Sequence, residues 1–372
     1  MEYGQERIAT LHDLTGTVPD APTDRAAVVV PMTEREYAGL AAERVLSELE
    51  SVVPGEVVVA LRAPAEKVAP FLDWLAGFDL PLSVVWCNGP AVTDLLDRYG
   101  LDGGTGSREA GKGRDVWLAL GVAAARSECV VVHDADAETY EAGDVARLLY
   151  PLSLGYEFSK GYYARVENGR LYGRLCRLFY APLVRALADA TPGAAVLDYL
   201  ASFRYALAGE FAASAEFVRT LRVERHWGLE VGTLGEAFGY AGFEGTAQVD
   251  LGRHEHDHRA VSGPTGLSDM SRHVGRALLR AVEAHGVVPD YDTLPDRYRG
   301  VAEEFVEQYA ADAGFNGLGY DRSEEREQVG IYAEAIAPPG EDRRLPAWRE
   351  VDLNPDEVLA ASREDVSDVR ER

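Results

Sequence analysis

The chain has 372 residues, 47% of them hydrophobic, and carries 62 acidic against 37 basic residues, a formal net charge of −25. A surface this acidic repels nucleic acid, so we expect no DNA or RNA partner. The longest apolar runs have the length of strands and fall far short of a bilayer span, so we expect no membrane-spanning segment.

The first half of the chain alternates predicted strands and helices. It begins with an irregular arm that ends near residue 25. The predicted strands cover 26–32, 56–62, 80–88 and the run that begins at 130. The predicted helices cover 33–50, the stretch up to 78, the stretch up to 99, and 114–127, and Thr33 and Glu36 form a capping box on the first. This order predicts a Rossmann-like α/β fold, with a mostly parallel sheet and helices on both faces.

The pattern changes from residue 144 onward. We predict a short helix, followed by the segment YEFSKGYYARV (156–166) and a long arginine-rich helix at 169–187. After these we predict a strand or loop at 204–212, a helix at 226–240, a strand at 246–252 and helices near 271–285 and 301–313. The tail after Pro338 is charged and proline-punctuated, so we expect it to be loosely held. We divide the chain into an arm (1–25), a Rossmann-like domain (26–143), a second part (144–290) and a helical extension with the tail (291–372).

Residue usage also indicates a cellular compartment. Only three basic residues are lysines and the other 34 are arginines. An acidic, lysine-poor chain is typical of the cytoplasm of an organism that accumulates salt, whereas an ordinary acidic enzyme is the alternative. The widely spaced Cys87, Cys129 and Cys176 predict reduced thiols. The N-terminus does not resemble a signal peptide, so we expect a cytoplasmic protein.

The predicted strand VVVHDADAE (130–138) ends in two aspartates, Asp134 and Asp136. Residues i and i+2 of an extended chain project to the same side, so these carboxylates need a cation, donors or water between them. Ligands of such sheets bind beyond the carboxyl ends of the strands. A D-x-D there is able to hold Mg²⁺ or Mn²⁺ with the diphosphate of a nucleotide sugar, and Lys112 in the preceding glycine-rich loop is a candidate for the phosphates.

Two alternatives fit these residues. Aspartates that follow a strand often form a turn or a helix cap, so a bare D-x-D is also compatible with a structural role. GSREAGKG (106–113) fits the P-loop pattern GxxxxGK of a phosphotransferase, with the aspartates as the Walker-B acids. Two features count against a P-loop: Gly113 replaces the Ser or Thr that binds Mg²⁺, and the loop follows a polar helix end instead of a strand.

Six segments then carry a resemblance to a known family: AGKGRDVWLAL, VVVHDADAE, GRLCRLFYAPL, LAGEFA, GLEVGTLGEAF and QVDLGRHEH. Over roughly residues 26–285 the chain resembles the glucosyl-3-phosphoglycerate synthases, GT-A-type retaining glycosyltransferases. The resemblance implies a metal-dependent enzyme, commonly a homodimer, that passes glucose from UDP-glucose to 3-phosphoglycerate. The product would lead to a glucosylglycerate-type organic solute. The donor site is expected in the Rossmann-like domain and the acceptor site in the part that covers 144–290.

The resemblance also implies roles for donor-side residues. Those expected to bind the donor are Pro31, Lys112, Asp134 and Asp136. Asp136 and His256 are expected to bind Mg²⁺ or Mn²⁺, and Asp136 and Glu230, which lies near the sugar, are the catalytic candidates. No residue stands out as a nucleophile, so we expect the acceptor to attack on the face that the diphosphate leaves.

On the acceptor side, Gly173 and Arg174 match a Gly-Arg pair that contacts the phosphate and carboxylate of the acceptor. Cys176 and His258 are acceptor-side positions where the family has threonine and asparagine, so another small anionic acceptor is the alternative. If 169–187 is one helix, its arginines share a face at spacing i, i+4, i+7 and form either a basic pocket or a salt-bridged surface. These arginines are Arg170, Arg174 and Arg177.

Three further points stay open. Residues 33–35 and 87–88 replace family residues of the nucleoside pocket, so the nucleotide is not fixed. The histidines of HEHDH (254–258) also allow a three-histidine zinc site, although neighbouring acids favour one histidine on a hard metal. A family 2 type polyprenyl-phosphate sugar transferase is the alternative enzyme, disfavoured because the sequence shows no membrane segment.

Overall fold

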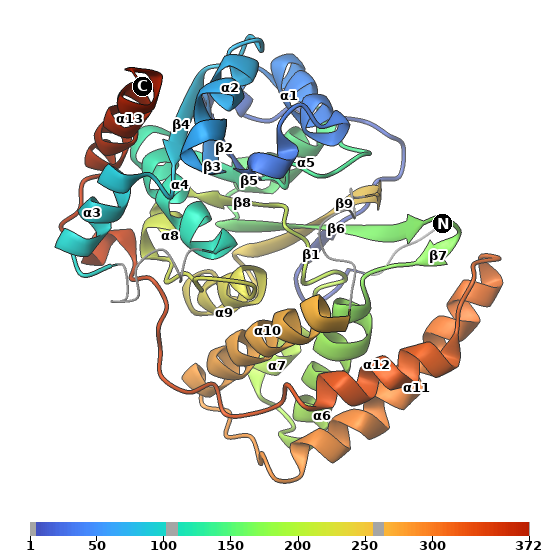
Figure 1. Cartoon of the computed structure of the whole chain (residues 1–372). Helices are drawn as coiled ribbons and strands as arrows, with labels where there is room; N and C mark the ends of the chain where they lie inside the picture. The colour runs from blue at the N-terminus through green and yellow to red at the C-terminus, as the bar shows by residue number, and fades with distance from the viewer. Residues whose placement is uncertain (1–4, 102–110, 256–263, 372) are drawn as a thin grey trace.

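The structure of the protein is a computed structural model, and it describes residues 5–101, 111–255 and 264–371. Within these residues one sheet of nine strands runs through the molecule, in the order β1-β9-β6-β8-β5-β2-β3-β4 with β7 beside β6 (Figure 1). The strands are β1 (Ala9–Leu11), β2 (Ala26–Thr33), β3 (Glu56–Arg62), β4 (Leu82–Trp86), β5 (Cys129–Val132), β6 (Phe158–Glu167), β7 (Arg170–Leu171), β8 (Phe211–Ser214) and β9 (Thr246–His254).

The β5-β2-β3-β4 part of the sheet is parallel, as the alternation of strands and helices predicted. Its valine-rich strands are almost wholly buried, because α1, α2 and α5 cover one face and α3 and α4 the other (Figure 1). These helices are α1 (Leu40–Val52), α2 (Ala65–Leu75), α3 (Pro90–Arg98), α4 (Lys112–Arg126) and α5 (Gly143–Ser153). The predicted fold class, a mostly parallel α/β sheet between helices, is confirmed.

Strand β8 runs antiparallel to both of its neighbours, β5 and β6. Its first residue, Phe211, pairs with Val132 at the carboxyl end of β5. The segment that leads into β8, residues 206–210, therefore arrives at the edge of the sheet where Asp134 and Asp136 follow β5. The sequence left 204–212 open between strand and loop, and the structure shows a loop followed by a strand.

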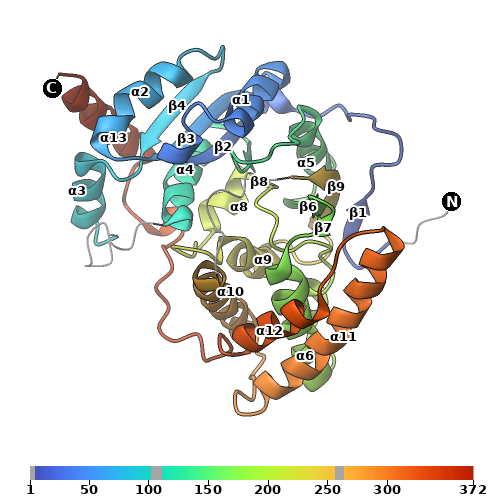
Figure 2. The ribbon, with the colours of Figure 1, turned by 45° about the vertical axis from the view of Figure 1, so that its right-hand side comes forward.

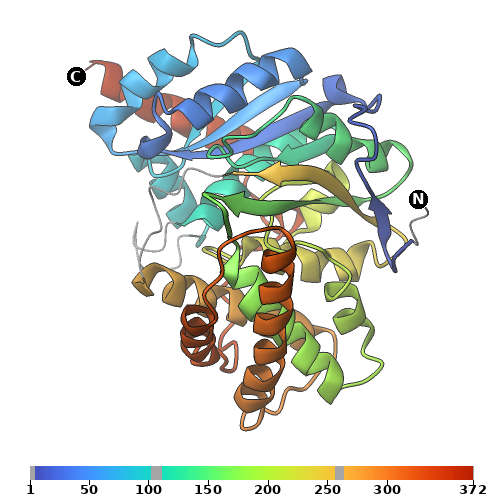
Figure 3. The same ribbon diagram turned by 90° about the vertical axis from the view of Figure 1, so that its right-hand side faces the viewer.

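A layer of helices lies on one side of the sheet and is visible below it in Figures 2 and 3. In this layer α11 packs against α6 and α12, and α10 packs against α9. The helices of the second half are α6 (Ala181–Ala190), α7 (Ala195–Leu200), α8 (Ala215–Thr220), α9 (Leu229–Tyr240), α10 (Pro264–Ala284), α11 (Leu294–Phe315), α12 (Arg322–Ala333) and α13 (Pro355–Glu371). No helix of the described residues is both long enough and apolar enough to cross a bilayer.

The predicted capping box of Thr33 and Glu36 is present, but it caps a short 3₁₀ turn, Glu34–Glu36. The α-helix begins only at Leu40. Ala38 has a φ of 51°, a left-handed conformation that ends any right-handed helix at that point. The expectation of one helix over 33–50 is therefore wrong at its start.

The expectation of one arginine-rich helix over 169–187 is also wrong. Arg170 lies in β7, and Gly173 turns the chain with a φ of 78°, so a helix cannot begin before it. A π-helix, Leu175–Tyr180, follows and continues into α6. Arg170 consequently does not share a helical face with Arg174 and Arg177.

Two terminal segments are better anchored than the sequence indicated. In the predicted irregular arm, β1 pairs in parallel with β9 and extends the sheet. The tail that we expected to be loosely held contains α13, which packs on β4 and α3. Ser362 of α13 accepts a hydrogen bond from the backbone N–H of Trp86 at 2.8 Å. Trp348 stacks on Trp117 of α4 with ring centroids 4.3 Å apart.

Asp365 of α13 provides the first prediction, because it caps the N-terminus of α3. Its carboxylate accepts hydrogen bonds from the backbone N–H groups of Ala91 (2.7 Å) and Val92 (3.2 Å). We expect Asp365→Ala to lower the free energy of unfolding by about 1–2 kcal/mol, the usual cost of losing such a cap. Urea unfolding measures this loss, and Asp368→Ala, at an exposed position of α13, is the control. Equal stability of the two variants would contradict the capping role.

Candidate functional site

A cavity of about 560 Å³ lies at the carboxyl ends of the parallel strands. It is bounded by the last residues of β2 and β3, by the segments that follow β2 and β5, by the first turn of α4 and by the residues before α9. Its lining is Pro31, Met32, Thr33, Glu34, Arg35, Glu36, Arg62, Gly111, Lys112, Asp115, Asp134, Ala135, Asp136, His226 and Trp227. The structure thus brings together all four residues predicted for the donor: Pro31, Lys112, Asp134 and Asp136.

Lys112 connects two sides of this cavity. Its ammonium Nζ lies 2.7 Å from Oδ1 of Asp134, which follows β5, and 3.2 Å from Oε1 of Glu230 in the first turn of α9. Burial alone would lower the pKa of Lys112, but the charges of Asp134 and Glu230 outweigh it and raise the pKa. Lys112 is the first residue of α4, so the helix fixes its backbone. It therefore holds a defined positive charge beside the aspartate pair.

Asp136 is in a different environment from Asp134. The protein atoms packed around it raise the pKa of its carboxyl to about 7, and the charge of Asp134 adds to this rise. A carboxylate with a raised pKa gains from any cation that arrives, because the cation relieves both the burial cost and the repulsion. Oxygen ligands at this position suit Mg²⁺ or Mn²⁺.

Sequence reasoning missed two buried charged residues of the site, Glu210 and Lys160. Neither carboxylate oxygen of Glu210 has a hydrogen-bond partner in the described residues, and burial followed by the charge of Asp134 raises its pKa. Lys160 in β6 donates to the carbonyl of Ala208, and burial lowers its pKa to about 8. The scarcity of lysine could have identified Lys160, since two of the three lysines lie here.

Residues 206–209 connect the donor side to the predicted acceptor side. A methyl group added at Gly209 would lie 2.2 Å from Oδ2 of Asp134, so only glycine fits there. The thiol of Cys176 lies against the backbone of Ala206 and Leu207. A methyl group at Gly173 would lie 2.9 Å from the hydroxyl of Tyr205. The predicted acceptor residues Gly173 and Cys176 thus lie one short segment away from the aspartate pair.

The arginines of the acceptor side are paired with α12. Nε of Arg174 lies 2.9 Å from Oε1 of Glu325, and Nη2 of Arg174 lies 3.1 Å from Oε2 of Glu324. Arg177 is buried, lies 3.5 Å from Glu325 and donates to the carbonyl of Tyr172. Of the two roles expected for these arginines, a basic pocket or a salt-bridged surface, the structure shows the salt bridge for Arg177. Arg174 contacts the same glutamate, Glu325.

Two predicted residues, His256 and His258, lie outside the described residues. Among the residues that are described, no group of three or more His, Cys, Asp or Glu side chains is arranged to hold a metal ion. His254 is buried, stacks on Tyr163 with ring centroids 4.2 Å apart, and has Nε2 3.7 Å from Asp144. The ring of His254 therefore packs in the interior, and the other two histidines of the zinc alternative lie outside the described residues.

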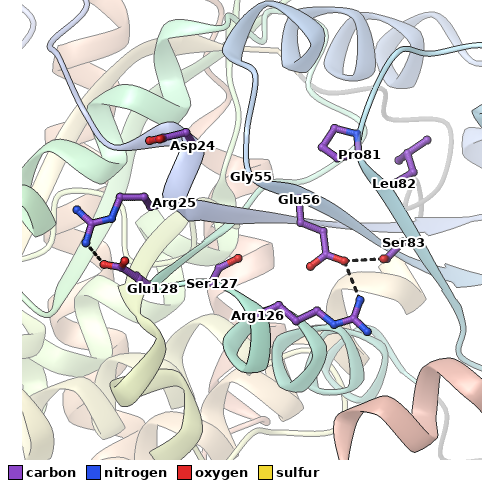
Figure 4. A pocket seen from close by; sticks show the side chains of 10 residues that line it. All are labelled: Asp24, Arg25, Gly55, Glu56, Pro81, Leu82, Ser83, Arg126, Ser127 and Glu128. Atoms are coloured by element: carbon purple, nitrogen blue, oxygen red, sulfur yellow. Dashed lines mark hydrogen bonds and ion pairs between the residues drawn. The ribbon is translucent and has the colours of Figure 1, made fainter.

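A second hollow of about 530 Å³ lies at the opposite edge of the sheet, at the amino ends of β2, β3, β4 and β5 (Figure 4). Four of its charged residues form two pairs, Arg25 with Glu128 and Arg126 with Glu56, and Glu56 also accepts from Ser83. None of the predicted site residues lines it. The cavity at the carboxyl ends is therefore the candidate active site.

Comparison with known proteins identifies the family. No protein-family model matches the chain. It is 32% identical to the glucosyl-3-phosphoglycerate synthase of Methanococcoides burtonii over 376 residues, 94% of this chain and 93% of that protein. It is 35% identical to the glucosyl-3-phosphoglycerate synthase of Persephonella marina over 322 residues, 83% of this chain and 79% of that protein. The chain belongs to the glucosyl-3-phosphoglycerate synthase family.

Membership of this family makes the protein a glycosyltransferase and confirms the resemblance found in the sequence. The fold agrees. The crystal structure of glucosyl-3-phosphoglycerate synthase from Mycobacterium tuberculosis in complex with Mn²⁺, UDP-glucose and phosphoglyceric acid superposes with a TM-score of 0.57. The match covers 77% of this chain and 89% of that chain at 24% identity, so it supports the GT-A fold. Membership of this family replaces the P-loop alternative, and the last element described before the glycine-rich loop is the helix α3.

The position of Lys112 gives the second prediction. We expect Lys112→Met to lower the free energy of unfolding at pH 7 by about 3 kcal/mol, because Asp134 and Glu230 would be left half-buried without their counter-charge. Urea unfolding at pH 7 measures the effect, and Lys67→Met, at an exposed position of α2, is the control. A Lys112→Met protein as stable as this control would rule out the ion-pair explanation.

Proposed function

We propose that this protein transfers glucose from UDP-glucose to 3-phosphoglycerate with the help of Mg²⁺ or Mn²⁺. The geometry that carries the proposal is the bridge from Asp134 through Lys112 to Glu230 inside the cavity at the carboxyl ends of the strands. Family membership over 94% of the chain supports the reaction. One crystal structure of the M. tuberculosis enzyme contains UDP-glucose, phosphoglyceric acid and Mn²⁺, and another contains UDP and Mg²⁺. We propose the same substrates and metals for this protein.

The residues present fit a divalent metal ion. Asp134 already accepts from Lys112, whereas Asp136 has a raised pKa and lines the cavity, so Asp136 is our proposed direct ligand, with His256 as the second. A metal ion bound there would neutralise charge that develops on the departing diphosphate. Lys112 would add a fixed ammonium beside the aspartate pair in the same cavity.

Several residues of the chain have proposed roles beyond the metal. Lys112 and the backbone near Pro31 hold the donor, and Glu230, whose carboxylate Lys112 orients, lies beside the sugar. Gly173 and Arg174 fix the acceptor, with Cys176 and His258 on the same side. The resemblance implies a retaining enzyme, and the sequence singles out no residue as a nucleophile. We therefore assign the attack to the acceptor, on the face from which the diphosphate departs.

Assembly and setting are further parts of the proposal. We infer a cytoplasmic homodimer that works at high salt, since the net charge of −25 and the near absence of lysine suit screening by concentrated ions. Light scattering and activity from 0.1 to 3 M KCl test both points. A polyprenyl-phosphate acceptor, the alternative, has no support in the described helices, none of which is suited to a bilayer.

The third prediction concerns turnover. Purified protein in high KCl with Mn²⁺ should form glucosyl-3-phosphoglycerate and UDP from UDP-glucose and 3-phosphoglycerate. We expect Asp136→Asn to lower kcat/KM at least a hundredfold, because the metal would lose an anionic ligand. Glu138→Gln, at an exposed position two residues further on, should stay within twofold of the parent. Full activity of Asp136→Asn would falsify the metal assignment, and failure of the parent with all hexose donors would reject the proposed reaction.

The fourth prediction is the pH dependence of metal binding. Because the pKa of Asp136 is raised to about 7, a proton competes with the metal for this carboxylate below that pH. The Kd for Mn²⁺ should therefore rise about tenfold per unit as the pH falls below 7, and level off above it. Calorimetric titration from pH 5.5 to 8.5 measures this slope. A Kd that stays constant across the range would show that Asp136 is not the titrating ligand.

A further inference from the structure

The proposed acceptor arginine is already occupied by carboxylates of this chain. Arg174 contacts Glu325 through Nε (2.9 Å) and Glu324 through Nη2 (3.1 Å). These glutamates lie about 150 residues further along the chain, beyond the segments that carried the resemblance in the sequence. An anionic acceptor that binds Arg174 at the same atoms must compete with them.

The two glutamates differ in burial. The side chain of Glu325 is 5% exposed, and its carboxylate contacts both Arg174 and Arg177. The side chain of Glu324 is 49% exposed and contacts Arg174. Removing Glu325 from this cluster would leave charge unpaired in the interior, whereas the carboxylate of Glu324 can turn to water at little cost.

The start of α12 keeps both carboxylates in place. Asp321 caps the helix by accepting from the backbone N–H groups of Ser323 (2.9 Å) and Glu324 (3.2 Å). Acidic residues in the first turn are also favoured by the helix dipole. Arg322 and Arg326 bind α12 to Glu303 and Glu307 of α11, so α12 is a fixed support beside Arg174.

Charge counting shows what this arrangement does. Arg174 and Arg177 supply two positive charges and Glu324 and Glu325 two negative charges, so the cluster is neutral before any ligand binds. Displacing Glu324 leaves one positive charge in excess, and it opens one edge of the planar guanidinium for a bidentate contact. A group with two acceptor oxygens and a charge of at least −1, such as a carboxylate or phosphate, replaces Glu324 fully. A chloride ion offers no second acceptor and replaces it poorly.

We propose that Glu325 is a positioning residue for Arg174 and Arg177, and that Glu324 is an internal anion that the carboxylate or phosphate of the acceptor displaces. This inference rests on the proposed function, because it assumes that Arg174 binds the acceptor. Glu324 then determines specificity: it weakens acceptor binding, and it protects Arg174 from monatomic anions such as chloride.

The test compares three neutralised glutamates of α12. Glu324→Gln should lower the KM for 3-phosphoglycerate three- to fivefold, the strength expected of an exposed ion pair, and leave the KM for UDP-glucose within error. It should also make chloride a stronger inhibitor, competitive with 3-phosphoglycerate. Glu325→Gln should raise the KM for 3-phosphoglycerate at least tenfold, because Arg174 loses its fixed partner. Glu327→Gln, at an exposed position of the same helix, is the control.

A KM for 3-phosphoglycerate that is unchanged or higher in Glu324→Gln overturns the inference, as does unchanged inhibition by chloride. Thermal melting of each variant shows whether it is folded, and a folded Glu325→Gln with parental KM overturns the positioning role. If the parent protein transfers no glucose to 3-phosphoglycerate, the proposed function fails. Calorimetric binding of 3-phosphoglycerate to the parent and Glu324→Gln then decides the inference separately, and equal affinity or no binding rejects it.

Discussion

The ion pairs of Lys112 are the interaction on which the organisation of the site depends. One ammonium joins Asp134, at the end of β5, to Glu230, at the start of α9, so a strand of the parallel sheet and a helix of the second half share one charge. Lys112 itself begins α4, whose helix is buried along almost its whole length. A side chain held this firmly loses little conformational entropy when a ligand binds. The phosphate-binding role that we propose for Lys112 requires such a side chain.

The site is acidic even though its expected ligands are anions. Four carboxylates, Asp134, Asp136, Glu210 and Glu230, influence the two lysines Lys112 and Lys160. Burial is the main cause that raises the pKa of Asp136 and of Glu210, and the negative charge of Asp134 adds to it. A divalent cation is the simplest way to balance these carboxylates. An ammonium fits between closely spaced oxygens where a planar guanidinium does not. This is a physical reason for two of the three lysines to lie here, in a chain whose other basic residues are almost all arginines.

Local sequence patterns were enough to predict the parallel half of the sheet and to bring Lys112, Asp134 and Asp136 to one place. Runs of valine marked the positions of the strands in the sequence. The spacing of Asp134 and Asp136 placed both carboxylates at the end of one strand. Features that depend on distant contacts could not be predicted. The two ends of the chain join the sheet through the packing of α13 on β4 and the pairing of β1 with β9. Local hydrophobic periodicity in the sequence does not predict such contacts between distant segments. The φ of Gly173 likewise separated Arg170 from the other arginines, although helical spacing had grouped them.

The antiparallel strand β8 explains why one short backbone segment connects the predicted donor side of the site with the predicted acceptor side. Had β8 run parallel to β5, the segment before it would lie at the opposite edge, near the hollow of Figure 4. Because β8 is reversed, residues 206–209 pass Asp134 at Gly209, accept a hydrogen bond from Lys160 at Ala208, and lie against Cys176. One short backbone segment thus fixes the separation between the aspartate pair and the Gly173–Arg174 turn. A reaction in which acceptor and leaving group share one face of the sugar needs that separation to be constant, and a buried segment held from both sides meets this need.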